Sequence, residues 1–187
     1  MDNWLQNVKQ IKEYLYIDEN DLLRDKFRDD AYLENLIEQG EKILSEYNEA
    51  DQIKIFGSLG HLYRIKGDTE TALPHLERYK DYAIKYEDDE TATLALLRYA
   101  EGLKYAREYN EALAIFEEVL ERCQLLDIEK YENIGWQQLG KCYLEMGDLK
   151  QAENCFLKAL ILRRKINDPK LLEASESVLN FMMKIKK

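Results

Sequence analysis

Residues 136–156 read WQQLGKCYLEMGDLKQAENCF, and this stretch decides the fold. Trp136, Leu139 and Tyr143 are spaced three and four residues apart, so they share one face of a helix. Gly147 and Asp148 then interrupt the pattern, because glycine favours the left-handed conformation that ends a helix and aspartate can cap the next one. The stretch therefore predicts two helices joined by a tight turn.

The same pattern occurs three times at a spacing of 40 residues. The third copy has Trp136, Leu139, Gly140, Tyr143, Ala152 and Phe156; the second has Leu96, Tyr99, Ala100, Leu103, Ala112 and Phe116; the first has Phe56, Leu59, Gly60, Tyr63, Ala72 and Leu76. The glycine–aspartate turn recurs in the first copy at Gly67 and Asp68, whereas the second copy has Arg107 and Glu108 there. A fixed period of this kind is typical of a stacked repeat protein.

The third copy resembles the tetratricopeptide repeat (TPR), whose pattern W-x2-L-G-x2-Y…A-x3-F it matches at every place. The family's unit is about 34 residues long, so the longer units of this chain resemble the long-repeat branch of the family. The resemblance covers residues 53–169 most clearly. It implies an all-α fold, a right-handed α-α superhelix of stacked antiparallel helical hairpins, which is called a TPR solenoid.

We expect residues 1–187 to form a single TPR-like helical repeat domain. Its expected parts are a divergent N-terminal hairpin (1–50), three repeats (51–90, 91–130 and 131–169) and a C-terminal capping helix (170–187). Apolar spacing predicts helices at 2–17 and 31–47 within the divergent hairpin. The charged stretch between them predicts a short helix around Leu22 and Leu23.

Composition and charge limit the classes of partner and the cellular location that we expect. The formal net charge of −10 argues against nonspecific binding to nucleic acid or to an anionic membrane. No run approaches the roughly 18 apolar residues of a spanning helix, and the first residues lack the features of a signal peptide. We therefore expect a cytoplasmic protein that binds neither nucleic acid nor membrane.

The sequence shows no arrangement of residues typical of catalysis or metal binding. It has no GxSxG motif, no Walker loop and no dinucleotide fingerprint. The three cysteines and two histidines lack the spacing of metal ligands, which favours packing roles for them. We expect no enzymatic activity, no metal and no cofactor.

The resemblance implies where a ligand would bind, because the first helix of each TPR hairpin lines the concave surface. The ligand-binding residues expected there are Lys54, His61, Arg64, Leu97, Arg98, Glu101, Lys104, Tyr105, Gln138, Lys141 and Phe181. All the concave positions together carry six basic residues against two acidic ones, although the whole chain is acidic. This contrast favours an acidic peptide with apolar anchors; the alternative is that the basic residues have no role in binding.

The sequence therefore predicts a protein- or peptide-binding scaffold. The alternative is a self-associating structural protein or a signalling-peptide sensor, with the C-terminal helix as the dimer contact. Apolar residues occur on both flanks of residues 170–185, and one preceding repeat cannot cover both flanks. A homodimer through this helix is one expectation; the other is that Phe181 folds back into the concave surface.

Overall fold

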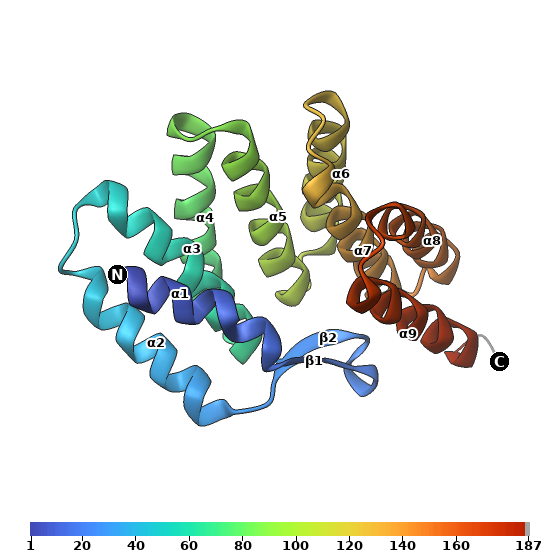
Figure 1. Cartoon of the computed structure of the whole chain (residues 1–187), viewed down its shortest axis with the longest axis horizontal. Coiled ribbons are helices and arrows are strands. Elements are labelled where there is room, and N and C mark those ends of the chain that lie inside the picture. Colours follow the sequence, from blue (N-terminus) through green and yellow to red (C-terminus); the bar gives the residue numbers. More distant parts are fainter. Residues whose placement is uncertain (186–187) are drawn as a thin grey trace. The chain divides into compact units, whose positions relative to one another are not determined.

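The computed structural model describes residues 1–185, apart from the side chains of residues 49 and 50. The last two residues of the predicted capping helix, 186–187, lie outside the described residues. The α-helices are α1 (Asp2–Gln10), α2 (Asp30–Leu44), α3 (Glu49–Lys66), α4 (Thr69–Tyr86), α5 (Asp89–Tyr105), α6 (Tyr109–Leu125), α7 (Glu129–Glu145), α8 (Leu149–Ile166) and α9 (Pro169–Ile185) (Figure 1). Two short strands, β1 (Leu15–Asp18) and β2 (Arg24–Phe27), pair in a two-stranded sheet.

The chain divides into two compact units. The first unit contains residues 1–18 and 25–108, and the second contains residues 19–24 and the chain from Tyr109 onward. The chain thus passes from the first unit to the second at Asp18 and returns at Asp25. The single domain over residues 1–187 stays a prediction.

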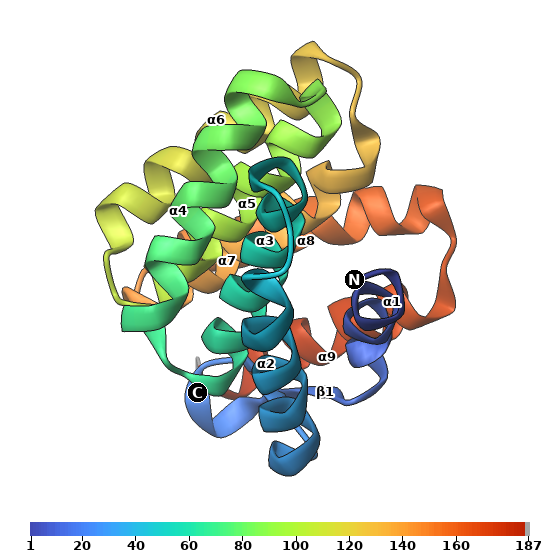
Figure 2. The same ribbon diagram turned by 90° about the vertical axis from the view of Figure 1, so that its left-hand side faces the viewer.

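In the first unit, consecutive helices from α2 to α5 pack against one another (Figures 1 and 2). The core beneath α1 and α2 is apolar, and its members include Trp4, Leu36, Ile55 and Leu59. The indole Nε1 of Trp4 donates a hydrogen bond to the carbonyl oxygen of Leu36 at 2.8 Å. This bond satisfies the one polar atom of a buried indole and fixes α1 against α2.

In the second unit, α6, α7, α8 and α9 pack consecutively. A Cβ atom added at Gly140 would lie 2.6 Å from the ring of Phe156, so glycine is required for this close approach of α7 and α8. Arg163 on α8 donates hydrogen bonds to Asn133 and Ser175, which link α8 to α7 and α9. The predicted antiparallel hairpins are therefore confirmed, and the fold class is all-α apart from the two short strands.

The predicted turns are confirmed. Gly67 and Gly147 have φ values of 90° and 85° and end α3 and α7. The side chains of Asp68 and Asp148 accept hydrogen bonds from the first turns of α4 and α8. In the second copy Arg107 takes the left-handed conformation with φ of 66°, so the turn is kept without its glycine.

The N-terminal region differs from the prediction. The predicted helix over 2–17 ends at Gln10 and is followed by a short 3-10 helix, η1 (Ile11–Glu13). The charged stretch does contain a short 3-10 helix, η2 (Glu19–Asp21), but Leu22 and Leu23 lie just outside it. These two leucines have φ values of 49° and 65°, which no right-handed helix permits. Leu15, Tyr16 and Ile17 instead enter β1, since aromatic and β-branched side chains favour an extended backbone.

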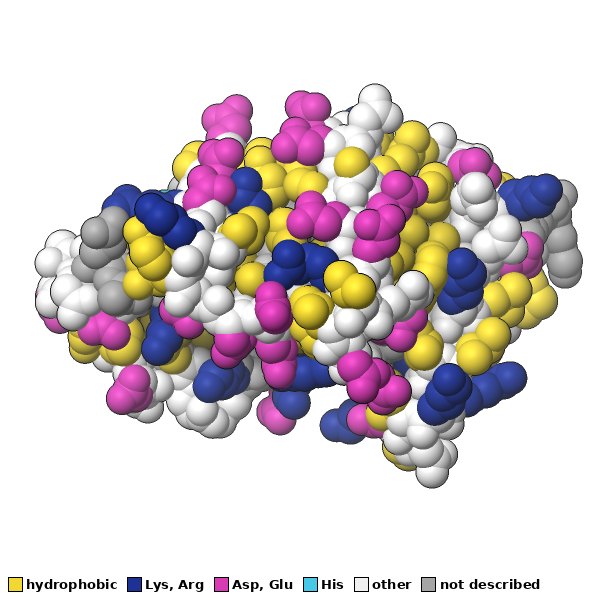
Figure 3. Space-filling model, turned by 90° about the horizontal axis from the view of Figure 1, so that it is seen from above, with side chains coloured by type: hydrophobic (Ala, Val, Ile, Leu, Met, Phe, Trp, Pro, Cys, Tyr) yellow, Lys and Arg dark blue, Asp and Glu magenta, His cyan; other side chains and the backbone are white. Residues whose placement is uncertain are grey.

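No helix in the described part of the chain combines the length and the apolar character that crossing a membrane requires. Acidic, basic and apolar side chains are interspersed on the face shown in Figure 3. The negative charge of the chain is therefore not gathered into one patch on that face.

Candidate functional site

Three of the predicted ligand-binding residues line one cavity in the first unit. Lys54 and His61 on α3 and Arg98 on α5 border a space of about 560 Å³. Ser58 and Tyr79 complete this wall; the opposite wall comes from α1 and the residues after it, and consists of Met1, Asp2, Leu5, Val8, Lys9, Ile11, Lys12 and Leu15. We call this space the α1 cavity. The sequence predicted its wall on α3 and α5 but not its wall on α1.

The α1 cavity is lined by an excess of positive charge. Four basic side chains line it, namely Lys9, Lys12, Lys54 and Arg98, against the single carboxylate of Asp2. Burial and the nearby cations of Arg64 and Arg98 lower the pKa of His61 well below its ordinary value. His61 is therefore neutral near pH 7, and the positive charge comes from the lysines and Arg98.

Arg98 is fixed in place by the protein itself. Its Nη1 donates a hydrogen bond to the carbonyl oxygen of Gly57 at 3.2 Å, and its guanidinium lies 5.8 Å from the ring centre of Tyr79. Gly57 is needed here, because a Cβ atom at this position would lie 2.8 Å from the Tyr79 ring. The guanidinium thus reaches the cavity already oriented, which lowers the entropic cost of binding a ligand.

Other predicted residues of the first unit are internal. Arg64 is 2% exposed; its Nη2 lies 3.1 Å from Oε2 of Glu101, and its Nη1 lies 3.7 Å from Oδ2 of Asp25. Its guanidinium also lies 4.6 Å from the ring centre of Tyr105, whose hydroxyl accepts a hydrogen bond from the backbone N–H of Asp25. Leu97 and Lys104 are buried as well.

The predicted residues of the second unit are also buried. Gln138, Lys141 and Phe181 are 7%, 2% and 6% exposed. Glu145, another concave position, accepts hydrogen bonds from Arg24, and Lys184 on α9 pairs with Glu19 at 2.8 Å. Residues 19–24 therefore cover part of the predicted surface within this unit.

The main omission of the sequence analysis is the β-hairpin formed by β1, β2 and the loop between them. Asp25 contacts Arg64 in the first unit, and Arg24 and Glu19 contact Glu145 and Lys184 in the second. The signal was present in the alternation of acidic and basic residues along 18–30. Several of those charges have partners inside the protein, far away in the sequence, which a local pattern cannot identify.

The C-terminal helix is covered on one flank. Val178, Phe181 and Met182 on α9 are buried, whereas Met183 is 58% exposed. This arrangement leaves an apolar side chain available for association. The homodimer through residues 170–185 stays a prediction.

Comparison with known proteins identifies the repeats. The profile of the family described as Tetratricopeptide repeat matches residues 90–165, which include the second copy and nearly all of the third. The repeats in residues 90–165 are tetratricopeptide repeats. The assignment to the long-repeat branch of the TPR family stays a prediction.

Solved structures support the TPR fold. TPR-like repeats of a kinesin light chain from Podosopora anserina match over 98% of this chain and 84% of theirs, with a TM-score of 0.69 and 12% identity. The apo form of RapI matches over 81% of this chain with a TM-score of 0.66 and 21% identity. This chain spans 56% of the length of RapI. No curated protein sequence matches the chain.

No cluster of three or more potential metal ligands occurs among the side chains that the structure describes. The three cysteines are buried, and none of them forms a disulfide in the part of the chain that the structure describes. Burial raises the pKa of the Cys123 and Cys155 thiols to about 11, so both are protonated near pH 7. These thiols thus have the character of small core residues.

Proposed function

We propose that this TPR protein is a protein- or peptide-binding scaffold, and that the α1 cavity binds an acidic segment with an apolar anchor. The observation that carries the proposal is the lining of this cavity, with four basic side chains beside Leu5, Val8 and Tyr79. A volume of about 560 Å³ falls within the usual range for ligand sites, about 300–1,000 Å³. It accommodates a few side chains of a peptide rather than a folded domain.

The predicted residues have two different roles in this proposal. Lys54, His61 and Arg98 contact the ligand, since they border the α1 cavity. Arg64, Glu101 and Tyr105 hold α3, α5 and Asp25 together beneath it. The Nδ1 atom of a neutral His61 accepts from Nη2 of Arg64 at 3.2 Å, which leaves the Nε2–H group to donate a hydrogen bond to an acidic ligand.

Binding of a labelled acidic peptide tests the proposal. The probe is a short peptide with two glutamates beside one leucine, measured by fluorescence anisotropy. The double variant Lys54→Gln/Arg98→Gln should bind about 10-fold more weakly, because two charge-assisted contacts are lost. Raising the salt concentration should weaken binding to the wild type, since partly exposed charges are screened.

A matched control variant distinguishes the loss of charge in the α1 cavity from a change in the net charge of the protein. Lys42→Gln/Lys85→Gln removes the same two charges from exposed positions on α2 and α4 of the first unit. It should bind the acidic probe as the wild type does. Equal weakening by both double variants, with unchanged melting temperatures, would show that only net charge matters and would refute the α1 cavity as the site.

The remaining expectations belong to the same proposal. We propose a non-enzymatic, cytoplasmic scaffold that binds neither nucleic acid nor membrane, with self-association through residues 170–185 as the alternative function. The exposure of Met183 supports that alternative. Light scattering on the full chain tests it, because a monomeric mass across micromolar concentrations would exclude the dimer.

A further inference from the structure

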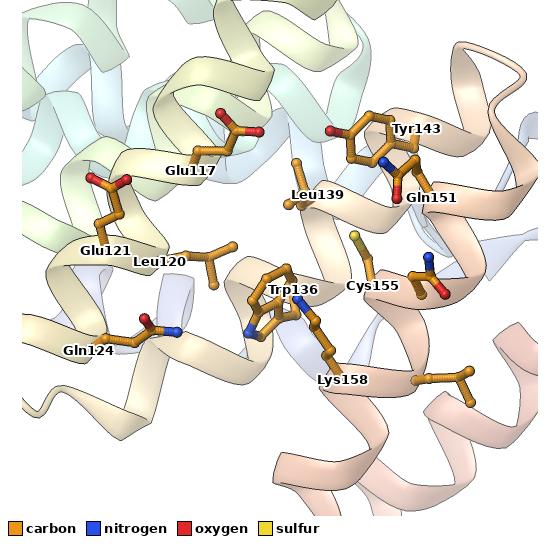
Figure 4. A pocket seen from close by; sticks show the side chains of 12 residues that line it. Glu117, Leu120, Glu121, Gln124, Trp136, Leu139, Tyr143, Gln151, Cys155 and Lys158 are labelled. Carbon is orange, nitrogen blue, oxygen red and sulfur yellow. The ribbon is translucent and has the colours of Figure 1, made fainter.

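A second groove lies in the second unit, where α6 and α8 form its walls and α7 its floor (Figure 4). Its volume is about 540 Å³. The lining residues are Glu117, Leu120, Glu121 and Gln124 on α6; Trp136, Leu139 and Tyr143 on α7; and Gln151, Asn154, Cys155, Leu157 and Lys158 on α8. We call it the α6–α8 groove.

This groove uses the face of α7 opposite to the predicted concave positions. Successive residues of a helix are rotated by about 100°. Trp136 and Tyr143 therefore project about 140° to 160° away from Gln138 and Lys141 in the helical projection. The α6–α8 groove is thus distinct from the concave surface that the TPR resemblance implies.

The floor of the groove is aromatic and accessible. The Nζ of Lys158 lies 3.7 Å from the ring centre of Trp136, so the indole faces the groove instead of the core. Leu157 and Ile161, four residues apart on α8, are 43% and 56% exposed. A half-covered tryptophan beside an exposed apolar stripe is typical of a protein-binding surface.

The first repeat shows that this opening is not a general feature of the repeats. Phe56 and Arg78 occupy the places of Trp136 and Lys158 there, and the guanidinium lies 4.4 Å from the ring centre. Phe56, however, is only 6% exposed. The carboxylate of Glu41 on α2 contacts both Tyr63 and His75, which closes the equivalent space.

Charge in the groove indicates the chemistry of its occupant. Glu117 and Glu121 lie four residues apart on α6, one helical turn from each other, and both are exposed. The facing positions Gln151 and Asn154 on α8 are uncharged amides. Figure 4 shows the Tyr143 hydroxyl and the Glu117 carboxylate pointing toward each other across the floor. The α6 wall is therefore acidic, whereas the α8 wall carries these two amides and the cation of Lys158, which lies over the Trp136 ring.

We propose that the α6–α8 groove binds a basic amphipathic helix from a partner protein. Its apolar ridge would pack on Leu120, Trp136 and Leu157, and two Lys or Arg residues one turn apart would pair with Glu117 and Glu121. Two helical walls and an apolar floor match the way in which helical peptides bind in grooves. The occupant is opposite in charge to the acidic ligand of the α1 cavity.

A pair of synthetic helical peptides tests the proposal. The basic probe has leucines three and four residues apart and two lysines four residues apart beside them; in the neutral probe, glutamines replace the lysines. Wild-type protein should prefer the basic probe by about 3- to 10-fold, the sum of two partly exposed ion pairs. In Glu117→Gln/Glu121→Gln this preference should disappear, because the two carboxylates that pair with the lysines are removed. The four affinities form a double-mutant cycle that isolates the charge pairing.

Two further variants locate the site. Leu157→Ser, at an exposed position, should weaken both probes about fivefold, since it shortens the apolar wall. Glu118→Gln/Glu176→Gln removes the same charge from exposed positions outside the groove and should bind as the wild type does. Lys54→Gln/Arg98→Gln should not weaken the basic probe, which separates this proposal from that for the α1 cavity.

Three results would overturn the proposal. One is failure of wild-type protein to bind the basic probe at millimolar concentration. Another is an equal preference for the basic probe in the wild type and in Glu117→Gln/Glu121→Gln. The third is a dimeric mass that Leu157→Ser converts to a monomer, because a second copy of the chain would then occupy the groove.

Discussion

Arg24 and Glu145 form a buried ion pair within the second unit. The Nε of Arg24 donates to Oε1 of Glu145 at 3.1 Å, Nη2 donates to Oε2, and the Glu145 side chain is only 1% exposed. The Tyr109 hydroxyl donates a third hydrogen bond to the same carboxylate. Residues 19–24 thus supply the main cation for a carboxylate at the end of α7.

Removing this cation should destabilise the protein. Arg24→Met removes a cation that pairs with a buried carboxylate, and we expect a loss of about 2–4 kcal/mol in the free energy of unfolding. Urea unfolding of the full chain measures this loss. The double variant Arg24→Met/Glu145→Leu should recover part of it, because no charge is then left buried.

The second ion pair of the same segment provides the control. Lys184 and Glu19 pair at 2.8 Å, but their side chains are 64% and 48% exposed. Lys184→Met should change the free energy of unfolding by less than about 0.5 kcal/mol. Similar losses in the free energy of unfolding for Lys184→Met and Arg24→Met would contradict the prediction, because the cost would then not depend on the burial of Glu145.

The turns between the two helices of each repeat give the second prediction. Arg107 holds a left-handed conformation where Gly67 and Gly147 stand in the other copies, and Arg107→Gly relieves its strain. We expect a gain of up to about 1 kcal/mol in stability, because the greater freedom of glycine in the unfolded chain offsets part of the relief. Thermal unfolding measures it.

The reverse change tests the same cause. A Cβ atom at Gly67 would meet no heavy atom within 4 Å, so any cost of Gly67→Ala comes from its φ of 90°. We expect a loss of about 1–2 kcal/mol. No loss, together with no gain in Arg107→Gly, would contradict the assignment of strain to these turns.

The repeats could be predicted from sequence because their signals are local. The spacing of Trp136, Leu139 and Tyr143 and the turn at Gly147 and Asp148 each fix a few neighbouring residues, and the structure has helices and turns at these places. Exposure could not be predicted in the same way. Trp136 occupies the same repeat position as Phe56, yet Phe56 is buried and Trp136 is half-buried. Phe56 packs in an apolar cluster with Tyr79 and Ala83 of α4, and the repeat pattern does not encode such a cluster.

The candidate site depends on contacts between residues far apart in the sequence. The TPR register places Lys54, Arg64, Arg98 and Lys104 on the concave face. It carries no information on residues 1–15, which form one wall of the α1 cavity, or on Asp25, which pairs with Arg64. The register alone therefore could not separate the residues that line a cavity from those that are enclosed.

Lys104 gives the third prediction, since its exposed fraction is 0% and its Nζ lies 5.0 Å from the ring centre of Tyr105. Lys104→Glu places a carboxylate in this enclosed position near Glu101, and we expect a loss of about 3–5 kcal/mol in the free energy of unfolding. Lys54→Glu, at an exposed position on α3, should cost less than about 0.5 kcal/mol. Equal effects in chemical denaturation would show that Lys104 is accessible, as a ligand-binding residue would be.

His61 gives the last prediction, which concerns pH. Burial, then the cations of Arg64 and Arg98, lower the pKa of His61 well below 6.5 in the folded protein, whereas Asp25 acts in the opposite direction. In the unfolded chain the pKa of His61 is about 6.5. At pH values between this pKa and the lower pKa of the folded protein, His61 binds a proton in the unfolded chain but not in the folded one. The folded state should therefore lose stability as the pH falls below about 6.5, and its full stability should be present above that value.

The variant His61→Gln isolates this effect, because it keeps a polar side chain and removes the titrating group. One proton contributes a slope of at most about 1.4 kcal/mol per pH unit. We expect the wild type to lose more stability than His61→Gln between pH 7 and pH 5.5, as measured by urea unfolding at each pH. Parallel pH profiles for the two proteins would show that His61 titrates normally and would remove the argument that it is neutral in the α1 cavity.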